Sequence, residues 1–224
     1  MSAWESQYGR DGQIVKGNAV LTSVAMEKGE GTMVFLVLGL LIFLGTHSLR
    51  LGGEFRRETL RQRWGDATFK SVYALLSAIG LVLVIYGFGL ARETPLVLWS
   101  PSTGMRHLTF ALMLVSMVLL AAAYVPGNGI RARLHHPMVV SVKVWALAHL
   151  LVNGTLAHVV LFGSFLVWSV LIFRVSRRRD KVLGLQYASG SGKATAITVG
   201  LGLLLTLVML GWLHGVLVGV RLLS

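Results

Sequence analysis

Six apolar segments constrain the fold of this chain more than any other feature of its sequence. They cover residues 33–49, 69–91, 107–125, 138–152, 156–173 and 194–220. About 20 apolar residues in helical conformation cross the hydrocarbon core of a bilayer. Only 13% of the residues are charged, far below the share in soluble domains. The pattern therefore predicts an all-α, polytopic membrane helix bundle with about six transmembrane helices.

Two of the six segments are short for a bilayer span. Segment 33–49 is slightly short, and segment 138–152 is short and interrupted by Lys143. We expect 138–152 to be enclosed by the other helices, where polar groups find partners. Pro137 suits the first turn of this helix, and Asn153-Gly154 predicts a tight turn that makes the fourth and fifth helices antiparallel neighbours.

The charge of the chain is distributed as in a membrane protein. Its formal net charge of +12 arises largely beside the apolar segments, which favours anionic lipid headgroups over nucleic acid as neighbours. Fourteen Lys and Arg residues lie in loops 50–70, 126–137 and 174–193, against six in the tails and the other loops. The positive-inside rule predicts that these three loops are cytoplasmic and that both termini lie outside.

Residues 1–32 differ from the rest of the chain. They are polar and lack the apolar core of a signal peptide. Two interpretations stay open for this stretch: a mis-annotated extension, with Met26 or Met33 as the true start, or a disordered tail. The membrane domain is expected to cover residues 33–224.

Histidines are the main candidates for chemistry. The chain has seven of them and no cysteine, and none of its nine acidic residues lies within an apolar segment. This argues against thiolate ligands, a carboxylate-rich metal site and the intramembrane acid of a proton-coupled transporter. Intramembrane imidazole suits haem or a late transition metal.

The stretch RARLHHPMVVSVKVWALAHLLVNG, residues 131–154, concentrates these polar groups. At about 100° per residue, His136 and Lys143 share one helix face at the basic end, where they and His135 are expected to be solvated. Trp145, His149 and Asn153 share the opposite face. His149 requires either a hydrogen bond to a neighbouring helix or a metal.

Other histidines extend the inventory of candidate ligands. His47 lies in GTHSLR, about 10 Å from His149 in depth by helical rise, which is compatible with two ligands on opposite faces of a haem but does not require it. His107 and His158 are expected to be solvated at the interface. His214 lies in GWLHGVLVG, where glycine recurs every four residues; this favours close helix packing over contact with a flat cofactor.

Several motifs together resemble the NnrU family of membrane proteins. The resemblance covers nearly everything after Met33. It rests on GTHSLRL at 45–51, YGFGLAR at 86–92, RHL at 106–108, AAYVPGNGIRARLHHPM at 122–138, KVWALAHLLVNG at 143–154, LFGSFLVWSV at 161–170 and WLHGVLVGV at 212–220. Members of this family are encoded near nitrite and nitric oxide reduction genes in denitrifying bacteria, and they are related to zeta-carotene isomerase.

The resemblance implies a haem b whose iron is held by His47 and His149, in a multi-pass protein of the bacterial inner membrane. It also implies nitric oxide, a hydrophobic polyene or nitrogen-oxide reductases as partners. The residues expected to surround the haem or its propionates are His136, Lys143, Trp145, Asn153, His107 and His214. The isomerase branch has a cysteine where this chain has Ala146, which places ligand exchange, and so isomerase activity, in question.

Four functions are compatible with these residues. The first is a haem b protein of nitrite or nitric oxide metabolism, and the second is a polyene cis-trans isomerase using the same haem. The third, an isoprenylcysteine-type methyltransferase, is disfavoured because LHHPMVV lacks the Arg and Tyr of the Arg-His-Pro-x-Tyr element. The fourth is a non-enzymatic assembly factor, and whether the protein is an enzyme at all stays open.

Overall fold

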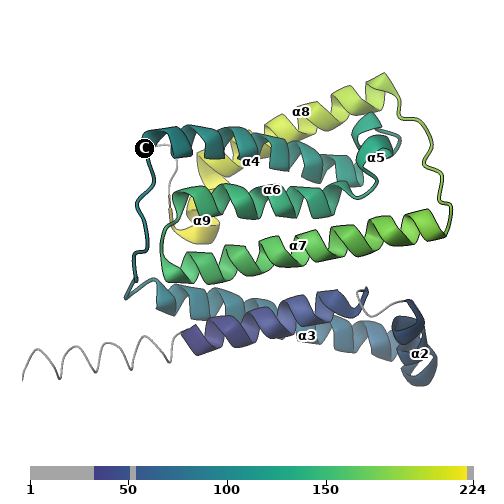
Figure 1. Cartoon of the computed structure of the whole chain (residues 1–224), viewed down its shortest axis with the longest axis horizontal. Helices are drawn as coiled ribbons and strands as arrows, with labels where there is room; N and C mark the ends of the chain where they lie inside the picture. The colour runs from purple at the N-terminus through teal and green to yellow at the C-terminus, as the bar shows by residue number, and fades with distance from the viewer. Residues whose placement is uncertain (1–32, 51–53, 221–224) are drawn as a thin grey trace, which may run out of the picture.

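The computed structural model describes residues 33–50 and 54–220, and every regular element in these two ranges is helical (Figure 1). Two isolated β-bridges, Val97 with Thr155 and Asn128 with Ser191, join loops to helix ends. The predicted extension, residues 1–32, lies outside the described residues.

The helices follow the six apolar segments in chain order. An apolar helix, Met33–His47, continues into the short 3-10 turn η1. The elements after it are η1 (Ser48–Arg50), α2 (Glu54–Trp64), α3 (Asp66–Ala91), α4 (Thr103–Tyr124), α5 (Gly129–Leu134), α6 (Pro137–Val152), α7 (Leu156–Val182), α8 (Gly192–Val208), the π-helical turn η2 (Met209–Leu213) and α9 (His214–Val218).

Four helical stretches are long and apolar enough to cross a membrane. They are Asp66–Ala91, Thr103–Tyr124, Leu156–Val182 and Gly192–Val218, the last comprising α8, η2 and α9. The predicted all-α membrane bundle is therefore confirmed. The other two apolar segments form shorter helices: the 16 residues of α6 extend over about 24 Å. A total of six spans accordingly stays a prediction.

Helix α7 is longer than the sequence predicted. Its end was expected at Phe173, with residues 174–193 as a cytoplasmic loop, but the helix continues to Val182. The residues 174–182 are mostly Arg and Lys, which are good helix formers, and the chain leaves the helix only before Gly184, whose φ of 61° is left-handed. Nine residues assigned to a loop are thus helical, and they carry an arginine-rich surface.

Helix α6 lies between α4 and α7 (Figure 1) and packs against both. Only two of its residues, Met138 and Leu147, are exposed, in agreement with the expected enclosure. Ser116 of α4 and Ser141 of α6 are buried between these helices, and each hydroxyl donates to the backbone carbonyl of the other residue, at 3.0 and 2.8 Å. Pro137 occupies the first turn of α6, as predicted.

Glycines bring the helix Met33–His47 against α3. A Cβ added at Gly39 would lie 2.5 Å from the backbone nitrogen of Val84, one at Gly80 would lie 2.7 Å from that of Phe43, and one at Gly87 would lie 2.3 Å from that of Leu36. The residue numbers rise on one helix as they fall on the other, so the two helices are antiparallel and their backbones are in close contact. This pair adjoins α7 (Figure 1), where the apolar core forms.

Candidate functional site

The two imidazoles expected to hold an iron have the same local geometry. His47 ends the first helix, and its Nδ1 lies 2.7 Å from the backbone oxygen of Phe43; His149 lies in the last turn of α6, and its Nδ1 lies 2.9 Å from that of Trp145. Because a carbonyl oxygen only accepts, Nδ1 carries the hydrogen in both rings. Nε2 is then the nitrogen with a free lone pair, which is the arrangement of a metal-ligating histidine.

The His47 and His149 rings occupy different levels of the bundle. The centroid of the His149 ring lies 4.6 Å from that of Phe162, whereas the His47 centroid lies 6.4 Å from that of Trp168. Phe162 and Trp168 are six residues apart on α7, which corresponds to about 9 Å of helical rise. The structure therefore does not bring the two imidazoles into contact.

A chain of aromatic rings fills the space between the two histidines. The Phe43 ring lies 4.3 Å from the His47 ring and 6.0 Å from the Phe165 ring, centroid to centroid. The Trp145 ring lies 5.4 Å from Phe165 and 5.2 Å from His149. Trp145, expected near a cofactor, therefore links His149 to this aromatic layer, and Phe162 borders both of these rings at 5.0 and 4.6 Å.

Asn153 has a definite role at the end of α6. Its side-chain nitrogen donates to the backbone oxygen of His149 at 2.9 Å, and its backbone is the C-cap of the helix. The same oxygen also accepts from the Asn153 backbone N–H at 3.0 Å, so Asn153 binds the last turn of α6 twice. It stabilises the turn that carries His149.

Among the remaining candidate histidines, His158 lies near His149, because the two rings border the same Phe162 ring at 6.0 and 4.6 Å. His107 is exposed on α4, as expected. His158 is half-buried, with its ring between those of Phe88 and Phe162 at 5.1 and 6.0 Å, and its Nδ1 lies 2.6 Å from the Thr155 hydroxyl. The prediction of a solvated His158 is therefore wrong, because the aromatic side chains of α3 and α7 enclose it.

The glycine ridge predicted around His214 is interrupted by a change in helix type, and two of its three glycines make no close contact. The π-helical turn η2 interrupts the regular spacing just before His214. Gly219 caps α9 with a φ of 76°, and a Cβ at Gly211 or at Gly219 would meet no atom within 4 Å. Gly211 and Gly219 therefore make no close helix contact, and the His214 Nδ1 donates to the backbone oxygen of Val220 at 2.8 Å.

His136 and Lys143 share a face of α6, as the helical wheel predicted. The Lys143 Nζ lies 4.3 Å from the centroid of the Phe173 ring, and the His136 ring lies 6.4 Å from the same centroid. Lys143 is held by a cation–π contact with α7. His136 is half-buried and donates from Nε2 to Asp180 at 2.7 Å, so the expectation that His136 is merely solvated is wrong.

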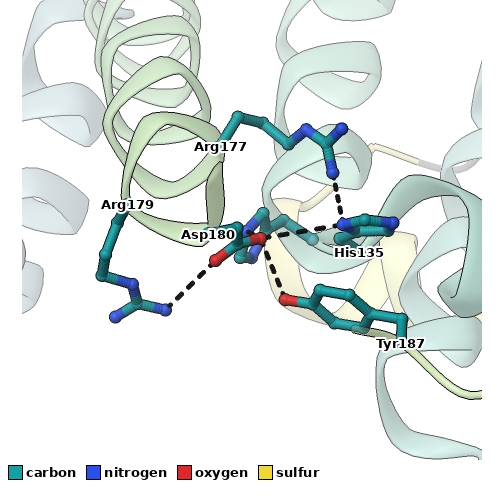
Figure 2. A network of polar contacts seen from close by, with 6 residues as sticks. His135, Arg177, Arg179, Asp180 and Tyr187 are labelled. Carbon is teal, nitrogen blue, oxygen red and sulfur yellow. Dashed lines mark hydrogen bonds and ion pairs between the residues drawn. The ribbon is translucent and has the colours of Figure 1, made fainter. Parts of the chain in front are cut away.

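Asp180 is the centre of a buried polar cluster that the sequence did not reveal (Figure 2). Its carboxylate, on a residue 4% exposed, accepts from the Tyr187 hydroxyl at 3.0 Å and from His136, and an Arg179 nitrogen lies 3.7 Å away. Burial, followed by the hydrogen bond to Asp180, raises the pKa of Tyr187 above its ordinary value. The phenol therefore remains a donor at physiological pH.

His135 completes this cluster. It adopts a φ of 66° at the end of α5, its ring stacks on that of Tyr187 at 3.8 Å, and its Nδ1 accepts from the Arg177 guanidinium (Figure 2). The cluster connects α5, α6, α7 and the segment before α8. His135 is thus structural rather than solvated. The sequence feature that could have indicated this cluster is a single acidic residue, Asp180, within a run of arginines.

No group of three or more His, Cys, Asp or Glu side chains suited to a metal ion occurs within residues 33–50 and 54–220. The described residues therefore offer separate imidazoles, and not such a cluster, as possible metal ligands.

Comparison with known proteins identifies the family of the chain. The family model described as NnrU protein matches residues 35–222, which is most of the chain and includes every histidine discussed above. No significant match is found among curated proteins or solved structures. The match agrees with the resemblance in the sequence motifs, and the chain belongs to the NnrU family.

Proposed function

We propose that this membrane protein binds haem b through His47 and His149 and takes part in nitrite or nitric oxide metabolism. The observation that carries the haem proposal is the shared geometry of the two rings. Each Nδ1 is committed to a backbone carbonyl four residues earlier, so that Nε2 is left to bind iron. The metabolic role rests on the family resemblance.

The chemistry of the site residues fits a haem. Both imidazoles are partly buried, and they are bordered by aromatic side chains that suit a flat apolar macrocycle. Because the two rings share no contact, joint ligation of one iron requires the Phe165 and Trp145 rings between them to move aside. His136 and Lys143 lie toward the basic end of the bundle, where cationic groups suit propionates.

A bound haem would supply a redox-active iron able to bind nitric oxide in its reduced form. The protein would hold and orient the imidazoles and exclude water from them. Ala146, where the isomerase branch has cysteine, is 0% exposed and has no ligating atom. This favours a haem protein of nitrogen-oxide metabolism over a ligand-exchanging isomerase, and an assembly factor that only carries haem would use the same residues.

The test is an absorption spectrum of the purified full-length protein in its oxidised, reduced and nitric oxide-treated reduced forms. The wild type should show a Soret band that shifts on reduction and again with nitric oxide. His47→Ala and His149→Ala should lose or alter the band. The matched control His107→Ala changes an exposed histidine and should retain it. A folded but colourless wild type, supplied with haem during expression, would contradict the proposal.

A further inference from the structure

The end of α7 carries a stripe of cations along one side of the helix. Side chains spaced i, i+3, i+4 and i+7 share a helix face, and at this spacing α7 holds four exposed cations: Arg174, Arg177, Arg178 and Lys181. The apolar run before the stripe, residues 156–173, extends over about 27 Å, close to the thickness of a hydrocarbon core of about 30 Å. The stripe therefore begins at the depth of lipid phosphates.

The basic stripe has almost no counter-charge within the protein. From α4 to the end of the chain, Asp180 is the only acidic residue, and its carboxylate is buried in the polar cluster that Arg177 also joins. Within the two described ranges, the side chains of Arg174, Arg178 and Lys181 form no hydrogen bond or ion pair. An anion from outside the chain would therefore meet uncommitted guanidinium groups.

A groove of about 430 Å³ continues the same face of α7 toward the middle of the bundle. Arg174 follows Val167 by seven residues, and Arg178 follows Leu171 by seven, so each arginine is two turns from a groove residue on nearly the same side of the helix. A Cβ at Gly163 would meet nothing within 4 Å, which leaves this side of the groove open. The groove is lined by Ser48, Gly163, Ser164, Val167, Trp168 and Leu171.

We propose that this face of α7 binds an anionic phospholipid, with one acyl chain in the groove and the phosphate against Arg174 and Arg178. The mainly apolar groove lies within the membrane-spanning part of α7 and leads directly to the stripe, as the chain and headgroup of one lipid require. Guanidinium groups bind phosphate oxygens in bidentate fashion, whereas the cation of a zwitterionic headgroup would be repelled by the stripe.

This site is distinct from the general attraction of anionic lipids to basic loops. A diffuse surface potential acts on every cation at the membrane surface, but the groove restricts one lipid to one face of one helix. The site uses neither His47 nor His149, so it is independent of haem binding and goes beyond the proposed function.

The test is photocrosslinking of the full-length protein in phosphatidylcholine nanodiscs containing a small fraction of phosphatidylglycerol with a photoreactive acyl chain. Peptide mapping should place the label within residues 163–171, in excess over phosphatidylcholine carrying the same chain. Arg174→Gln and Arg178→Gln should each lower this preference about fivefold, the factor expected for one cation at an anionic lipid surface. The matched control Arg133→Gln removes an exposed charge from α5, at the same end of the bundle (Figure 1), and should leave the preference unchanged.

A second pair of variants tests the acyl chain separately from the headgroup. Gly163→Leu should fill the groove without displacing protein atoms, because a Cβ there has open space, and should abolish labelling of residues 163–171. The matched control Gly200→Leu lies on α8, where a Cβ also meets nothing within 4 Å, and should retain the labelling. Every variant is compared with the wild type at retained secondary structure and melting temperature.

Four results would overturn the phospholipid site. They are equal labelling by the two lipids, labelling that maps outside residues 163–171, full labelling of folded Gly163→Leu, and a loss in Arg133→Gln equal to that in the stripe variants, which would indicate a diffuse surface potential alone. The readout needs no haem. A colourless protein with selective labelling would contradict only the proposed function, and a haem protein without lipid preference would contradict only this inference.

Discussion

The contact between the first helix and α3 predicts opposite effects for two neighbouring glycine substitutions. A Cβ at Gly87 would lie 2.3 Å from the backbone nitrogen of Leu36, whereas one at Gly89 would meet nothing within 4 Å. Because the atom opposite Gly87 is backbone, it cannot rotate away, and the helices must separate by about 1 Å to reach ordinary contact. The separation loosens the packing of Leu36 and Val84, which are 0% and 7% exposed.

The size of this effect follows from two opposing terms. Overpacking a core costs about 1–3 kcal/mol, and a forced gap between helices adds lost dispersion contacts, so we place the cost for Gly87→Ala near the upper end. Replacing glycine by alanine within a helix stabilises the helix by about 1 kcal/mol. The expected net loss is about 2 kcal/mol, or a melting temperature lower by about 4–8 °C for a chain of this size.

The assay is thermal unfolding of purified wild type, Gly87→Ala and Gly89→Ala in the same detergent. Gly89→Ala has the same helical preference without the contact, and its melting temperature should be unchanged or raised by a few degrees, about 1 kcal/mol at most. Equal melting temperatures for the two variants would refute the close antiparallel contact, since helix propensity alone would change both melting temperatures in the same direction.

Two further predictions concern the cluster around Asp180. Asp180→Asn removes the charge of a residue that is 4% exposed and leaves His136 and Arg179 without their carboxylate. The expected loss of about 3 kcal/mol in the free energy of unfolding should lower the melting temperature by about 6–12 °C. The control Glu58→Gln breaks an exposed ion pair and should cost under about 1 kcal/mol. Tyr187 has a raised pKa in the folded protein, so the stability that it contributes is fully present below its unfolded pKa of about 10 and is lost as the pH rises through the folded value. A melting-temperature series should therefore show that the deficit of Tyr187→Phe relative to wild type narrows above about pH 10, and a deficit independent of pH would contradict this role.

The sequence predicted helices well and contacts poorly, and the difference has a physical basis. Apolar runs locate α3, α4 and α8 because burial in lipid acts on each segment separately. Pro137 and Asn153 mark the ends of α6 because capping is local. The end of α7 was missed by nine residues, since a hydropathy pattern cannot distinguish a basic loop from a helix that projects beyond the membrane.

The candidate site shows the same limit at the level of single residues. The shared face of His136 and Lys143 follows from helical periodicity and was predicted. The partner of His136 was not, because Asp180 is distant in sequence and reaches the cluster only through the extension of α7. Likewise, nothing local to Trp168 indicates that its indole nitrogen is buried without an acceptor among the described residues. A tryptophan in an apolar helix is most simply interpreted as a core or interface residue.

The position of His47 depends on residues that do not touch it. Gly39, Gly80 and Gly87 fix the register of the first helix on α3. A slip by one residue would rotate the first helix by about 100° and shift it by about 1.5 Å. Such a slip would remove the His47 ring from Tyr73 and Trp168, while leaving its Nδ1 bonded to the Phe43 carbonyl, because that bond is internal to the helix. The orientation of the His47 ring within its helix is therefore local, but its contacts with Tyr73 and Trp168 depend on the glycine contact between the two helices. The position of the His47 ring thus depends on small residues on both the first helix and α3.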